Sequence, residues 1–154
     1  MPKEPITNAV FNAVLLRLRA IKAGEKYFCS PVVHEQKINI ERHMCPAIVV
    51  YQLGDEWAND QGESEACGAV EVLVKQQILI CLFHVSPETV NRLKADAEAA
   101  LFVGGGYLLR QTATDPAVTY RLAGPSGAPP GEGLELGDAR FVLTAVYKRA
   151  HGSP

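Results

Sequence analysis

The sequence has 154 residues, of which 47% are hydrophobic and 21% charged, and its formal net charge is −2. A chain of this size can bury a core without metal or disulfides, so we expect a single domain over residues 1–154. The lack of net positive charge argues against general attraction to nucleic acid or to an anionic membrane and favours protein partners.

The sequence predicts neither a secretory signal nor a membrane span. Residues 1–7 have no apolar signal core, and no apolar run approaches the ~20 residues that a spanning helix needs. We therefore expect synthesis in a cytosol, with the cysteines present as reduced thiols. These are Cys29, Cys45, Cys67 and Cys81.

Residues 8–23 carry the first clear pattern, with apolar side chains at intervals of three and four. This period predicts an amphipathic helix, with Thr7 as its N-cap and Gly24 as a left-handed C-terminal cap. Arg17, Arg19 and Lys22 fall outside the apolar stripe and are expected on its solvated face.

The stretch that follows is expected to hold an arm, a strand and a loop. Residues 25–45 have no sustained period and predict an extended arm, whereas the β-branched run 47–53 predicts a strand. Residues 54–68 are acidic and poor in apolar side chains, so we expect a long projecting loop between antiparallel strands. Long loops are uncommon in compact domains, which suggests a binding or assembly role.

Residues 69–101 carry the strongest signal, an apolar alternation that runs directly into a capped helix. The odd positions change from Glu71, Lys75 and Gln77 to apolar residues, so the strand is expected to be peripheral at its start and central at its end. Ser86 and Pro87 fit the N-cap and first position of a helix. The even strand positions expected to be buried are Val70, Val72, Val74, Ile78, Ile80 and Leu82, followed on the helix by Val90, Leu93, Ala97 and Leu101.

The last third predicts short strands, a second loop and a final strand. Gly104 to Gly106 are expected to form a cap and hinge, followed by strands over residues 107–112 and 118–122. Residues 124–138, rich in Pro and Gly, predict a second projecting loop, and residues 139–149 a largely buried strand with a basic end. The order α-β-β-α-β-β-β predicts an α+β fold, a mainly antiparallel sheet of about five strands with two helices on one face.

No group of residues predicts catalysis, a metal or a cofactor. Cys29, His34, His43 and Cys45 are ligand types that zinc prefers, but without a Cys-x-x-Cys pair scattered residues in an arm explain them better. His84 near a strand end fits a hydrogen-bonded or edge histidine better than a catalytic base. The acidic segment lacks the spacing of a calcium loop, and the glycine run follows a helix instead of preceding one. We therefore expect a structural component of an assembly and not an enzyme.

Four stretches together carry a family resemblance. They are "ITNAVFNAVLLRLRAI", "CPAIVVYQLGDE", "VEVLVKQQILICLFHVSPETVNRLKADAEAAL" and "ARFVLTAVYKRA". In the order and lengths of its elements, over nearly the whole chain, the sequence resembles the tail terminator, or tail-completion, proteins of long-tailed bacteriophages.

The resemblance implies a virion protein of the tail and neck, made in the host bacterial cytoplasm. Such a protein would form a homohexameric ring that caps the tail tube, ends tube polymerisation and presents a surface to the head connector. Its partners would be copies of itself, the tail tube protein and the neck proteins, with DNA passing through the lumen without specific binding. Candidate subunit or lumen contacts are Asp55, Glu56, Trp57, Asp60, Glu63, Glu65, Arg17, Arg19, Lys148 and Arg149.

Two alternatives stay open from the sequence. Head-completion or connector-adaptor proteins of the neck are similar in size and also form rings. A small ligand-binding or RNA-processing α+β domain is the second alternative, for which His84, Tyr107 and Arg110 would have to meet in a pocket.

Overall fold

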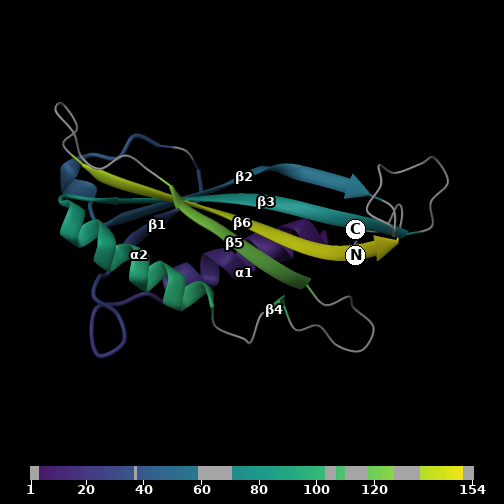
Figure 1. Ribbon diagram of the computed structural model, residues 1–154, viewed down its shortest axis with the longest axis horizontal. Helices are drawn as coiled ribbons and strands as arrows, with labels where there is room; N and C mark the ends of the chain where they lie inside the picture. The colour runs from purple at the N-terminus through teal and green to yellow at the C-terminus, as the bar shows by residue number, and fades with distance from the viewer. Residues whose placement is uncertain are drawn as a thin grey trace.

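The computed structural model describes residues 4–36, 38–58, 71–102, 107–109, 118–126 and 136–150. These residues form an α+β fold with two helices, as the sequence predicts, and the sheet is mixed because one of its strand pairs is parallel (Figure 1). The elements are α1 (Ile6–Arg19), β1 (Val32–His34), the 3-10 helix η1 (Arg42–Met44), β2 (Ala47–Ala58), β3 (Glu71–His84), α2 (Pro87–Leu101), β4 (Tyr107–Leu109), β5 (Val118–Ser126) and β6 (Gly137–Ala150).

The strands lie in the order β1-β2-β3-β6-β5-β4. Only the β1–β2 pair is parallel among these strands, and the other four pairs are antiparallel. β3 lies between β2 and β6 along most of its length, from Leu73 to Phe83. The expectation that β3 is peripheral at its start is therefore wrong. Lys75 and Gln77 are exposed because they lie on the side of the sheet away from the helices.

The core lies between the sheet and the two helices, which cover the same face (Figure 1). The even positions of β3 from Val72 to Leu82 are at most 1% exposed, which confirms the predicted buried face. The predicted stripe of α2 is also buried, from Val90 to Leu101. Val70 lies outside the described residues.

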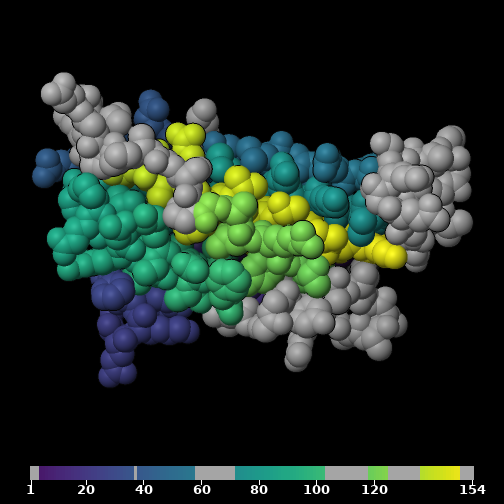
Figure 2. Space-filling model, viewed as in Figure 1, coloured from purple at the N-terminus to yellow at the C-terminus, as the bar shows by residue number. Residues whose placement is uncertain are grey.

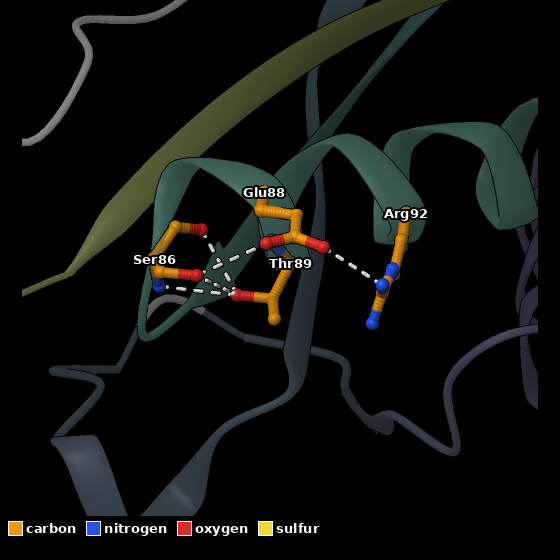
Figure 3. Close-up of polar contacts among 4 residues, drawn as sticks. All are labelled: Ser86, Glu88, Thr89 and Arg92. Carbon is orange, nitrogen blue, oxygen red and sulfur yellow. Dashed lines mark hydrogen bonds and ion pairs between the residues drawn. The ribbon is translucent and has the colours of Figure 1, made fainter.

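The start of α2 follows the predicted capping chemistry (Figure 3). The Ser86 hydroxyl accepts from the Thr89 N–H at 3.3 Å, and the Thr89 hydroxyl accepts from the Ser86 N–H at 3.1 Å. Pro87 takes the first helical position, where it costs no hydrogen bond. One turn on, Glu88 and Arg92 form an ion pair at 2.8 Å.

The predicted boundaries of α1 are wrong at both ends. The helix begins at Ile6 after Pro5 and ends at Arg19, four residues before the predicted end at residue 23. Thr7 lies inside the helix, and its hydroxyl is 3.1 Å from the Tyr147 hydroxyl instead of capping. Gly24 does not adopt the positive φ of a left-handed cap, and its N–H donates to the Tyr27 carbonyl at 3.0 Å.

The predicted arm and loops are shorter than expected. The arm contains β1 and η1, so the predicted element order lacks a strand. β2 continues five residues past residue 53 through a bulge between Gln52 and Gly54, where Gly54 has φ 144°. β5 extends to Ser126, and β6 begins at Gly137. Residues 59–68 and 127–135 of the predicted loops, the glycine run 104–106 and residues 110–112 lie outside the described residues.

No helix in the described part of the chain is long and apolar enough to cross a bilayer.

Candidate subunit-contact surfaces

The outer edge of β2 is the most open backbone in the described sheet. β1 pairs only with Ala47 to Val49, and no described strand lies beside residues 50–58 on that side. At ~3.3 Å per residue, this β2 edge is about 30 Å long. Leu53 and Trp57, on this edge strand, are 49% and 48% exposed. An unpaired edge with exposed apolar side chains is a place where another strand can add.

The acidic candidates on β2 do not form one cluster. Asp55 lies opposite Gln76 on the helix side of the sheet, whereas Glu56 lies opposite Lys75 on the other side. Partial burial raises the pKa of Asp55, while the Arg149 charge acts in the opposite direction. Both residues were expected in a loop and lie in a strand instead, because the bulge at Gly54 lets β2 continue. Asp60, Glu63 and Glu65 lie outside the described residues.

The structure brings two of the predicted contact residues together near the C-terminal ends of β2 and β6. The Arg149 guanidinium of β6 lies 4.5 Å from the centre of the Trp57 ring of β2. This distance allows a cation–π interaction, which holds the exposed indole in place. Lys148 points to the opposite face, opposite Leu73, and is exposed.

Beside this pair lies a buried polar network that the sequence analysis did not identify. Gln76 is fully buried, and its Nε2 donates to the Thr7 carbonyl in the first turn of α1 at 3.0 Å. The Tyr147 hydroxyl lies 3.1 Å from the Thr7 hydroxyl and donates to Gln76 Oε1 at 3.4 Å. Burial raises the pKa of Tyr147, so its hydroxyl stays protonated. The signal in the sequence is a glutamine at an even position of an otherwise apolar row.

The expectation that Arg17 lies on the solvated face of α1 is wrong. Its Nη1 donates to the Leu101 carbonyl at 2.7 Å, and the Tyr120 hydroxyl donates to the same oxygen. The guanidinium also lies 5.6 Å from the centre of the Tyr120 ring. Arg17 therefore satisfies a carbonyl at the C-terminus of α2, where a positive charge is favourable. Arg19 is on the surface, in an ion pair with Glu35 at 2.5 Å.

On the other side of the sheet lie β5 and the short β4, and β5 is on the surface between α2 and β6 (Figure 2). β4 pairs only with Val118 and Thr119, so no described strand lies beside residues 120–126 on that side. Arg121 is exposed, and Phe102, 57% exposed, packs against the Tyr120 ring with the ring centres 5.9 Å apart. We call this the β5 edge.

The loop between α1 and β1 projects past α2 (Figures 1 and 2) and is fastened to it by a buried carboxylate. Asp96 is 2% exposed, and its oxygens accept the N–H groups of Phe28 at 2.9 Å and Cys29 at 2.8 Å. Burial, and then the charge of Asp96, raise the pKa of the Cys29 thiol to about 11. Asp96 therefore positions the loop backbone and adds to the effect of burial on the pKa of the Cys29 thiol.

The residues first considered for zinc are held by other contacts. His43 lies 3.2 Å from Glu41, and the Cys45 thiol donates to the Glu41 carbonyl. His34 lies on β1, and its Nε2 is buried without a hydrogen-bond partner among the described residues. Within those residues, no group of three or more His, Cys, Asp or Glu side chains is placed to hold a metal ion.

His84 lies at the end of β3, where its Nδ1 accepts the N–H of Val85 at 2.9 Å. Burial lowers its pKa, so the ring is mainly neutral at pH 7. The second alternative from the sequence requires His84, Tyr107 and Arg110 to meet in a pocket. The side chains of Tyr107 and Arg110 lie outside the described residues.

In comparison with known proteins, no family model matches the sequence, and no curated protein matches it.

Proposed function

We propose that this chain is a structural subunit of a tailed-bacteriophage virion. In this proposal it forms a homohexameric ring on the end of the tail tube, ends tube polymerisation and offers the attachment surface for the head connector. The proposal rests on the resemblance in element order and on one structural observation, the open β2 edge.

The β2 edge supports a ring because it offers a strand edge to which a different surface of a neighbouring copy can bind. A contact between two different surfaces of identical copies is heterologous, and repeated rotation closes such contacts into a ring. Natural edge strands often carry charges and bulges that prevent unspecific pairing. β2 has both, with Asp55 and Glu56 next to a bulge at Gly54, so it is suited to a specific neighbour.

Native mass spectrometry of the purified chain, alone and mixed with tail tubes, tests the proposal. We expect a six-fold oligomer and tubes that carry a cap at one end and no longer grow. A twelve-fold ring would favour a connector-adaptor protein of the neck. A monomer or dimer that leaves tube growth unchanged would contradict the ring and favour a binding module or an enzyme.

A paired substitution tests whether the β2 edge is the contact. Leu53→Lys places a charge at the edge and is expected to abolish the ring. Leu16→Lys is the matched control, since Leu16 on α1 is 73% exposed and lies away from the β2 edge. Equal loss of the ring in both variants would show that added charge alone, and not the edge, is responsible.

A further inference from the structure

The edge segments of β2 and β5 themselves carry side chains of opposite charge, although Arg149 of β6 lies over Trp57 and Lys75 of β3 lies opposite Glu56. On the β2 edge, residues 54–58 hold Asp55 and Glu56 and no basic residue. On the β5 edge, residues 118–126 hold Arg121 and no acidic residue, and Arg17 lies over Tyr120 on the helix side. Large exposed apolar side chains lie at both places, Leu53 and Trp57 on β2, and Phe102, which follows α2 and packs against Tyr120, beside β5.

Pairing of two β2 edges is disfavoured by this distribution. It would place Asp55 and Glu56 of one copy beside the same residues of the next, and like charges on neighbouring strands are destabilising. Pairing of a β2 edge with a β5 edge instead brings Glu56 towards Arg121, which both lie on the side of the sheet away from the helices.

The strand directions are also compatible with this pairing. β2 is antiparallel to β3, β3 to β6, and β6 to β5, so β2 and β5 run in opposite directions. A neighbouring copy that continues the same sheet would therefore place its β5 antiparallel to β2, with the perpendicular hydrogen bonds of an antiparallel ladder.

We propose that the β2 edge of one copy pairs with the β5 edge of a second copy of this chain, so that the sheet continues from subunit to subunit. Residues 54–57 and 120–123 form the ladder, with Glu56 opposite Arg121, because a bulge precedes the first segment, β4 occupies Thr119, and an irregularity follows Ala123 in the second. This inference rests on the proposed function for its closed ring and adds the partner of the β2 edge.

A charge swap between copies tests the pairing. Glu56→Arg gives two basic edges, and Arg121→Glu gives two acidic edges. Each variant alone is expected to weaken oligomer formation by at least about tenfold. An equimolar mixture is expected to restore the oligomer with alternating copies, because every contact then joins opposite charges.

Two features make the swap interpretable. Within one chain Glu56 and Arg121 are three strand spacings apart, about 14 Å, so neither substitution directly disturbs the other. Lys22→Glu is the matched control, since Lys22 is an exposed basic residue outside both edges. Circular dichroism and thermal melting of all variants establish that the fold is retained.

Hydrogen exchange gives an independent measure of strand pairing. On assembly, the amides of residues 54–57 and 120–123 are expected to become protected together. Unchanged exchange in either segment on assembly, an oligomer unaffected by Arg121→Glu, or a mixture that fails to restore it would each overturn the pairing.

The failure of the pairing and the failure of the proposed function give different results. If the charge swap weakens the oligomer and the mixture restores it, but tail tubes remain uncapped, the β2–β5 pairing is supported and the tail-end role is rejected. If the chain caps the tail tube but its ring is unaffected by the charge swap, the tail-end role is supported and the β2–β5 pairing is rejected. A wild-type chain that is monomeric at every concentration, with or without tubes, rejects both.

Discussion

At the scale of single residues, two buried polar side chains link segments that are distant in the sequence. Gln76 joins the middle of β3 to the first turn of α1, and Asp96 joins α2 to the loop at Phe28 and Cys29. A buried polar group stabilises only when it is hydrogen-bonded, and losing one partner exposes the full desolvation cost of the other. Both side chains are therefore expected to tolerate few substitutions.

Gln76→Leu is expected to lower the free energy of unfolding by about 1–3 kcal/mol, because the Thr7 carbonyl and the Tyr147 hydroxyl lose a partner. Urea denaturation measures the change. Gln77→Leu is the control, as Gln77 is the next residue, is exposed and faces the helix-free side. That change is expected to stay within ~0.5 kcal/mol, and an equal loss in both variants would contradict the role of the network.

The Cys29 thiol predicts a pH dependence in the alkaline range. Its pKa is raised from 9.0 to about 11, so the folded state holds the thiol proton more tightly than the unfolded state does. The resulting stabilisation is complete below pH 9 and is lost as pH rises towards 11. Wild type should therefore lose stability more steeply than Cys29→Ala over this interval, as measured by denaturation at a series of pH values. If the stability of both proteins fell equally with pH, the role of the Cys29 thiol would be contradicted.

At the scale of elements, α2 and β6 approach so closely that one position tolerates only glycine. A Cβ atom added at Gly137 would lie 2.6 Å from Cγ2 of Val90. Val90 is β-branched and 5% exposed, so it has little freedom to move aside. The first residue of β6 is thereby packed against the first turn of α2.

Gly137→Ala is expected to destabilise the fold by about 1–3 kcal/mol through this overlap. The double variant with Val90→Ala should lose less than the sum of the single changes, because the two positions are in contact. Gly24→Ala is the control, since a Cβ there meets no atom within 4 Å. Thermal melting of the four variants measures the coupling, and strict additivity would argue against the overlap.

The elements that could be predicted are those whose signals are local. The alternation of β3 and the Ser86–Pro87 start of α2 depend on neighbouring residues alone, and both are confirmed. The end of β2 could not be predicted, because an acidic segment stays in a strand only when β3 supplies its hydrogen bonds. β1 was missed for the same reason, since three residues pair with β2 without any period of their own.

The candidate contact residues also divide into those that local sequence reveals and those that depend on distant residues. Composition predicts that Asp55, Glu56 and Trp57 lie on the surface, and they are exposed, although in a strand instead of a loop; their role as contacts stays a prediction. The role of Arg17 could not be read from its helix, because its partner, the Leu101 carbonyl, is 84 positions away. Pairing of Trp57 with Arg149 likewise depends on the order of the strands.

At the scale of the whole molecule, the proposed ring separates two roles for the acidic residues. In the proposed assembly Glu56 belongs to the contact between copies, whereas Asp60, Glu63 and Glu65 remain candidates for an acidic lumen. Like charge along a lumen would keep the DNA phosphates from binding to its wall.

Replacing Asp60, Glu63 and Glu65 together by Ser is expected to leave the ring intact and to impair DNA passage, since fewer negative charges would repel the duplex. Native mass spectrometry and the infectivity of virions assembled with the variant measure the two effects. Glu25 and Glu98, exposed acidic residues elsewhere, serve as controls when changed to Ser. Normal infectivity of the triple variant would reject the lumen role.

The position of β6 also constrains how the protein is made. This strand comes last among the described elements, yet it lies in the middle of the sheet between β3 and β5. Its Tyr147 meets Thr7, 140 positions earlier. During translation, β3 therefore lacks a partner on one side, and β5 on the side that faces β6, until β6 has left the ribosome. Chains truncated before residue 137 are therefore expected to remain incompletely folded and to bind chaperones, whereas the full chain folds once it is released.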